Sequence, residues 1–183
     1  NPLNHYSRSK LLGEQYVREA GCRHLVLRTN MFGWNRGSKL SLSEWVLSCL
    51  RARQVIQGFS DVFFSPMLVN GIADTCVALY DRGLEGTYHI GARDSMSKLE
   101  FARRIARVFE LDESLIESSS LASAALLAPR PGNTSLNVSK ATRDMDAEFP
   151  TIEEQLTRLR SLEESGYVSA LKKSGSTNSD GTA

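Results

Sequence analysis

Apolar and polar residues recur along the chain with two spacings, which predict a mixture of helices and buried strands. Residues 6–20 carry apolar side chains at helical spacing, and Gly21 follows as a stop signal. Residues 25–29 form a short apolar run bounded by polar residues, which is typical of a buried strand in a parallel sheet. A helix that leads into such a strand is the second half of a βαβ unit, so its first strand would have to lie before Asn1.

The same two patterns predict the elements of the rest of the chain. A helix capped by Ser43 is predicted to turn an apolar face inward, formed by Trp45, Val46, Cys49 and Leu50. A second helix covers residues 69–80, with Ile72, Cys76 and Leu79 on one face. A third is capped by Ser97, with Glu100 completing a capping box, and a fourth covers residues 151–165. Short strands are predicted at residues 54–57 and 87–90.

The connecting segments are as informative as the elements. Residues 30–39 form a glycine-punctuated loop at the carboxyl end of the first strand, where open α/β sheets place their ligands. We expect a loop over residues 59–68, a loop with a short helix over residues 112–127, and no regular structure in the proline-containing segment 129–133. Residues 169–183 have the composition of a disordered tail.

Composition narrows the class of protein. The 183 residues are 41% hydrophobic, which is enough for the core of one domain. The formal net charge is +1, and acidic and basic residues are interspersed, so no basic face is predicted that would bind nucleic acid or a membrane surface. No apolar run approaches the roughly 20 residues that a bilayer span needs. The three cysteines and three histidines lack the spacing of a disulfide framework or a metal site, so we expect a cytoplasmic protein without a metal.

Tyr6 and Lys10 are the first candidates for chemistry. Four positions apart on a helix, they lie on one face. An ammonium group within a few ångströms favours a phenolate and can lower the pKa of a tyrosine by on the order of 1 to 3 units, which brings proton transfer closer to neutral pH. The spacing alone also fits a chance pair.

The neighbouring residues add a family resemblance. The pattern Asn4-x-Tyr6-x-x-x-Lys10-x-x-Gly13-Glu14, followed by residues 27–33, resembles the active-site helix and next strand of the extended short-chain dehydrogenase/reductases. Residues 65–66, 87–91 and 129–136 are similar to the branch that contains the dTDP-4-dehydrorhamnose reductases. The similarity extends over about residues 2–165.

This resemblance implies an α/β chain, in which residues 1–168 form the C-terminal part of a Rossmann-type, NAD(P)-binding fold with a small substrate-binding lobe. It implies a nucleotide-sugar substrate, with NADP or NAD as cofactor, and leaves a homodimer open. Tyr6 would be the proton donor and Lys10 would hold the nicotinamide ribose. The other implied site residues are Asn30, Met31 and Phe32 beside the cofactor, Met31 also beside the sugar, and Arg130 and Asn133 beside the nucleotide of the substrate.

Two parts of the family pattern are missing from these residues: the glycine-rich turn that holds the cofactor pyrophosphate and a Ser or Thr beside the tyrosine. Gly83-x-x-Gly86 is no substitute, because it precedes a strand instead of opening a helix. We therefore expect a fragment that is inactive alone. Two alternatives remain open, namely a nucleotide-sugar epimerase or dehydratase and a non-catalytic regulatory subunit with the same fold.

Overall fold

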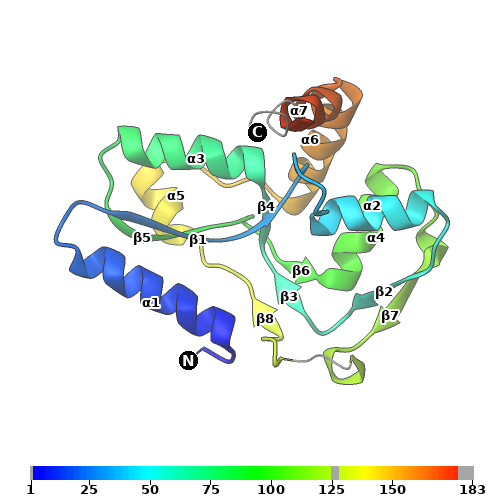
Figure 1. Ribbon diagram of the computed structural model, residues 1–183, viewed down its shortest axis with the longest axis horizontal. Helices are drawn as coiled ribbons and strands as arrows, with labels where there is room; N and C mark the ends of the chain where they lie inside the picture. The colour runs from blue at the N-terminus through cyan, green and yellow to red at the C-terminus, as the bar shows by residue number, and fades with distance from the viewer. Residues whose placement is uncertain (1, 125–127, 177–183) are drawn as a thin grey trace, which may run out of the picture.

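A three-stranded parallel sheet forms one half of the computed structural model, which describes residues 2–124 and 128–176 (Figure 1). Helix α1 (His5–Glu19) leads into the central strand β1 (Leu25–Phe32). Strands β4 (Pro66–Leu68) and β5 (Gly86–Ile90) flank β1 in the order β4-β1-β5, and both pairings are parallel. The predicted helix, parallel strand and α/β class are thereby confirmed, but β1 is only partly buried, with Phe32 its one buried residue.

Helices lie on both faces of this sheet. Figure 1 shows α1 on one side of β1 and α3 (Val69–Asp81) on the other. Helix α3 and α5 (Ser139–Met145) enclose a core against the sheet that includes Met67, Leu79, Tyr88 and Ile90. No residue of α1, which the structure describes in full, is buried.

The second half of the fold packs around a larger core. Helices α2 (Leu42–Arg51), α4 (Lys98–Val108) and α6 (Ile152–Glu164) surround it, and β2 (Ile56–Phe59) pairs in parallel with β7 (Ile116–Ser119). Phe32 and Phe64 each meet Phe101 edge to face, with ring centroids 5.2 and 5.1 Å apart. Helix α7 (Tyr167–Ser176) lies beside α6 (Figure 1). Short 3₁₀ turns flank β7 at Glu113–Leu115 and Leu121–Ser123.

A small sheet lies between the two halves. Strand β3 (Phe63–Phe64) is its centre, with antiparallel β6 (Met96–Ser97) on one side and parallel β8 (Asn133–Thr134) on the other. The register places Asn133 opposite Phe63 and Thr134 opposite Phe64. Segments near residues 63, 97 and 133 therefore meet, although they are far apart in the chain.

Close packing explains several of the residues that carry the family resemblance. A Cβ added to Gly91 would lie 2.7 Å from the carbonyl oxygen of Ser65, so only glycine fits where β5 ends. The hydroxyl oxygen of Ser65 in turn accepts a hydrogen bond of 3.3 Å from the backbone N–H of Leu136. These residues join the sheet to the segment that follows β8, and their role here is structural.

Several predicted boundaries were wrong, and long-range pairing is the usual reason. Residues 59–68 contain β3 and β4 instead of forming a loop, and residues 112–127 contain β7. Strand β1 continues to Phe32, because Asn30, Met31 and Phe32 pair with β4. Residues 169–176, expected in a disordered tail, belong to α7, while residues 177–183 lie outside the described part of the chain.

Two helix starts also differ from the sequence prediction. Ser41, not Ser43, caps α2 and forms a capping box with Glu44, while Ser43 is buried inside the first turn. Ser97 does cap α4, but the Glu100 carboxylate accepts from Arg104 instead of completing a box.

The predicted inner faces of α2 and α3 need one change each. Trp45 is 41% exposed beside the buried Val46 and Leu50. On α3 the buried residues are Thr75 and Leu79, whereas Cys76 is exposed. Among the described helices, none is long and apolar enough to cross a membrane.

Candidate active site

Tyr6 and Lys10 lie on one face of α1, as their spacing predicts. The Lys10 Nζ is 5.6 Å from the centroid of the Tyr6 ring, within the range of a cation–π contact. The Tyr6 side chain is 70% exposed, so its hydroxyl is open to a ligand. The helix that carries the pair begins at the Asn4 cap, whose Oδ1 accepts from the Ser7 N–H at 2.9 Å.

An ion pair fixes this helix against the central strand. Arg28 on β1 donates two hydrogen bonds of 2.8 and 2.7 Å to the Glu14 carboxylate on α1. Hydrogen bonding to Arg28 lowers the pKa of Glu14, and the same bonds raise the pKa of Arg28, so both groups stay charged. The pair holds α1 beside the strand that ends in Asn30 and Met31.

Two asparagine amides connect these elements to the late segment of the chain. Asn30 Nδ2, near the carboxyl end of β1, donates to the carbonyl oxygen of Thr134 at 2.9 Å. Asn4 Nδ2, at the start of α1, donates to the carbonyl oxygen of Pro129 at 2.9 Å. Residues 129–134 therefore contact both the start of the helix that carries Tyr6 and the carboxyl end of β1.

Met31 and Phe32 are neighbours with opposite surroundings. Met31 is 64% exposed, whereas Phe32 is 2% exposed and packs in the larger core. Only the backbone of Phe32 remains available to a cofactor, so its side chain is structural. A strand alternates its faces from one residue to the next, and the sequence prediction placed both residues in a loop.

Arg130 and Asn133 lie on either side of the turn that enters β8, and both are exposed. Asn133 Oδ1 accepts from the N–H of Ser135 at 2.8 Å, which stabilises the local turn. Arg130 forms no hydrogen bond or ion pair with the described residues. Of the two predicted substrate contacts, Arg130 is the one whose side chain makes no hydrogen bond to the described residues.

The sequence analysis missed Lys98, the first residue of α4. Its Nζ lies 3.2 Å from the centroid of the Phe64 ring. Burial, together with the nearby charge of Arg130, lowers the pKa of Lys98 from its ordinary 10.5 to about 8. A lysine at the first position of a helix, where the helix dipole disfavours a cation, was the signal in the sequence.

The residues present suit only one end of a nicotinamide cofactor. Lys10 offers an exposed ammonium donor next to Tyr6, which fits the hydroxyls of a ribose. Among residues 2–124 and 128–176, however, the glycine-containing segment that joins a strand to a helix, residues 33–41 between β1 and α2, has only Gly33 and Gly37 and lacks the closely spaced glycines of a turn that binds a pyrophosphate.

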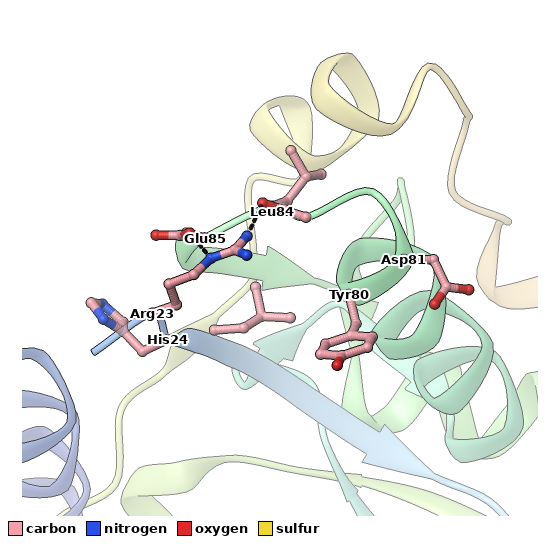
Figure 2. Close-up of a pocket in the computed structure, with 8 residues that line it drawn as sticks. Arg23, His24, Tyr80, Asp81, Leu84 and Glu85 are labelled. Carbon is pink, nitrogen blue, oxygen red and sulfur yellow. Dashed lines mark hydrogen bonds and ion pairs between the residues drawn. The ribbon is translucent and has the colours of Figure 1, made fainter.

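A separate cavity of about 630 Å³ lies at the amino ends of β1 and β5, the opposite end of the sheet. Figure 2 shows Arg23 directed toward Glu85, with Tyr80 and Asp81 on α3 across the opening. Arg23 forms an ion pair with Glu85 and donates to the Gly83 carbonyl oxygen at 2.9 Å. These charges satisfy one another, and the cavity contains none of the predicted site residues.

Comparison with known proteins identifies relatives. The family model described as the RmlD substrate binding domain matches residues 1–164. The probable low-salt glycan biosynthesis reductase Agl14 of Haloferax volcanii is 33% identical over 161 residues, which cover 86% of this chain and 54% of the relative. Methionine adenosyltransferase 2 subunit beta of Danio rerio is 30% identical over 151 residues, with coverages of 76% and 46%.

A solved structure shares the fold. The crystal structure of dTDP-4-dehydrorhamnose reductase from Bacillus anthracis, in complex with NADP, is 25% identical and superposes with a TM-score of 0.79, covering 87% of this chain and 56% of that one. The chain thus spans about half the length of the curated relatives it matches.

Proposed function

Because this chain belongs to the RmlD substrate binding domain family, we propose that it supplies the proton donor and the substrate side of an NAD(P)H-dependent reductase of 4-keto nucleotide sugars. The observation that supports the proposal is that the Tyr6–Lys10 pair shares a face of α1, while the segment 129–134 is hydrogen-bonded both to the cap of that helix and to Asn30 on β1. The proposal extends to the whole protein, of which this chain would be the second half.

A reduced nicotinamide, when bound with its ribose held by Lys10, would supply the hydride for the carbonyl carbon of the sugar. Tyr6 donates its hydroxyl proton to the carbonyl oxygen, which completes the alcohol and leaves a phenolate. The Lys10 ammonium on the same helix face stabilises that phenolate and donates to the ribose hydroxyls of the cofactor. Solvent then returns a proton to Tyr6.

The substrate side is formed by the other two segments. Met31, exposed at the end of β1, would contact the sugar, and Asn30 fixes the neighbouring backbone through Thr134. The Arg130 guanidinium, with no partner among the described residues, suits a phosphate because it can donate two parallel hydrogen bonds.

The first alternative keeps the fold and changes the reaction. An epimerase or dehydratase returns the hydride to its substrate, so NAD is not consumed. The test uses a protein that carries this chain together with a cofactor-binding half, supplied with NADPH and a dTDP-4-dehydro sugar. Stoichiometric oxidation of NADPH with formation of the alcohol supports reduction, whereas product formation without net oxidation contradicts it.

The second alternative is a non-catalytic subunit. The similarity to a subunit of methionine adenosyltransferase gives this alternative a specific basis. The retained and exposed Tyr6–Lys10 pair favours catalysis instead, because a regulatory surface does not require a proton donor. Replacing Tyr6, as described in the Discussion, separates the two.

A further inference from the structure

The outer edge of strand β4 is buried, although no strand of the described chain lies beside it. Strand β4 is at the end of its sheet and pairs on one side only, with residues 30–32 of β1. All three residues of β4 are buried. A buried backbone N–H or C=O group without a partner costs free energy, so the groups that face outward from this edge need partners from elsewhere.

One side chain of α6 supplies these partners. Gln155 is 3% exposed, and its Oε1 accepts from the backbone N–H of Leu68 at 2.6 Å. Its Nε2 donates to the carbonyl oxygen of Pro66 at 3.4 Å and to that of Thr151, at the start of α6, at 3.2 Å. Pro66 has no N–H to satisfy. The amide of Gln155 therefore takes the place that a peptide group of a neighbouring strand would occupy.

Helix α6 is a fixed support for this amide. The carboxylate of Asp94 accepts from the N–H of Ile152 in the first turn at 2.9 Å. One turn after Gln155, the carbonyl oxygen of Leu159 accepts from Nε1 of Trp34, in the loop that follows β1, at 3.0 Å. Helix α6 thus contacts both the strand beside the carboxyl end of β1 and the loop that leaves that end.

We propose that Gln155 is a positioning residue for the substrate side of the candidate active site. Its amide holds β4, and β4 holds β1 through the pairs Asn30–Pro66 and Met31–Met67. Gln155 thereby sets the position of Met31, whose exposed side chain is proposed to contact the sugar. The effect on the sugar rests on the proposed function, whereas the effect on the position of Met31 does not.

The first test measures steady-state kinetics of a protein with both halves, with NADPH and a dTDP-4-dehydro sugar. Gln155→Met keeps the length of the side chain and removes its donor and acceptor. KM for the sugar should rise by roughly 3- to 10-fold, the usual value of a lost hydrogen bond. The value of kcat should change by less than about 2-fold, because a contact made equally in the ground and transition states affects KM alone.

A loss of stability would have the opposite signature. A smaller folded fraction lowers the apparent kcat and leaves KM unchanged. Ile105→Val is the matched control, because it trims a fully buried residue of α4 and leaves the amide of Gln155 in place. We expect this control to keep the wild-type KM.

Gln155→Glu tests the hydrogen bonds themselves. A protonated carboxyl group can accept from Leu68 and donate to Pro66, whereas a carboxylate can only accept and would repel the carbonyl oxygen of Pro66. The ratio of the KM of this variant to the wild-type KM at the same pH should therefore fall as the pH falls. The change should occur above the ordinary glutamate range, because burial raises the pKa of a carboxyl group.

A double substitution tests the route through Met31. In a Met31→Ala background, Gln155→Met should raise KM no further, because the two changes act on one contact. The inference is overturned if Gln155→Met lowers kcat and leaves KM unchanged, if it raises KM equally with and without Met31, or if the KM ratio of Gln155→Glu does not vary with pH. If Gln155→Met does not fold, the pH series of Gln155→Glu decides.

The proposed function can fail independently, because two measurements on the 183-residue chain need no turnover. Relative to Ile105→Val, Gln155→Met should speed hydrogen exchange of the Leu68 amide and shift the methyl NMR resonance of Met31. If a protein with both halves does not oxidise NADPH but both changes occur, the reductase proposal fails and the positioning of Met31 stands. If the Met31 resonance does not move, the positioning role fails whether or not NADPH is oxidised.

Discussion

Asn4 Nδ2 donates a hydrogen bond of 2.9 Å to the carbonyl oxygen of Pro129, although 125 positions separate the two residues. The same asparagine caps α1 through its Oδ1, which accepts from Ser7. One side chain thus sets both the start of the Tyr6 helix and the position of the segment that carries Arg130. The proton donor and the predicted phosphate ligand are connected through it.

The two roles of Asn4 can be separated by substitution. Asn4→Asp keeps the capping oxygen and removes the amide donor, so we expect near wild-type thermal stability but weaker binding of dTDP, by about 2- to 10-fold for one lost hydrogen bond. Asn4→Ala removes both and should cost about 1 kcal/mol more in the free energy of unfolding. Unchanged dTDP affinity in Asn4→Asp would show that the bond to Pro129 does not position Arg130.

Tyr6→Phe removes the proposed proton donor while leaving the ring beneath Lys10. In a protein with both halves, we expect kcat for NADPH oxidation to fall by roughly 10² to 10⁴, the usual contribution of a general acid. Tyr16→Phe is the matched control, because Tyr16 is also exposed on α1, at 62%. Undiminished turnover in Tyr6→Phe contradicts the catalytic assignment and favours the non-catalytic subunit.

Met31 and Phe32 should respond oppositely to truncation. Phe32→Ala leaves a cavity beside Phe101 and should lower the free energy of unfolding by about 3–5 kcal/mol. Met31→Ala, at an exposed position, should change it by no more than about 0.5 kcal/mol and instead alter KM for the sugar. Urea denaturation measures the first effect and steady-state kinetics the second. A Met31→Ala variant with unchanged KM would exclude this side chain from the sugar contact.

Lys98 should make stability depend on alkaline pH. Its folded pKa of about 8 lies below the ordinary value of 10.5, so the unfolded chain binds the proton more tightly. The charged Lys98 therefore lowers the free energy of unfolding, by its full amount at pH values below the folded pKa. This destabilisation disappears as the pH rises through the ordinary lysine value. Near pH 7, Lys98→Met should therefore be more stable by about 1–2 kcal/mol, after subtraction of the lost ring contact.

Urea denaturation of both proteins at neutral and at alkaline pH measures this effect. The advantage of Lys98→Met should shrink as the pH approaches the ordinary lysine value, because Lys98 then loses its proton in both states. An advantage that does not change with pH would assign the stabilisation to packing instead of charge.

The isolated chain of 183 residues should bind NADP poorly. Lys10 can hold only the ribose end of the cofactor, and the described residues offer no glycine-rich turn for its pyrophosphate. Titration calorimetry should detect dTDP binding under conditions where NADP binding is weak or absent. Tight NADP binding by this chain would contradict the assignment of the pyrophosphate to another segment.

The sequence by itself determined the features that depend on neighbours within one or two turns. The Tyr6–Lys10 face follows from a four-residue spacing, and the start of α6 follows from the capping box of Thr151 with Glu154. The parallel pairing of β1 was also predicted from its apolar run at residues 25–27, although the strand is only partly buried. Local spacing is enough wherever the interaction partners are close in the chain.

Only the tertiary structure decided which residues meet across the chain. Phe32 is core and Met31 is exposed because pairing with β4 sets the alternation at the end of β1. Three contacts join segments that are far apart in the chain, and nothing in either local sequence indicates its partner. They are the hydrogen bonds of Asn4 to Pro129 and of Asn30 to Thr134, and the contact of Lys98 with the Phe64 ring. These contacts form only after long loops have closed, so a short stretch of sequence cannot predict them.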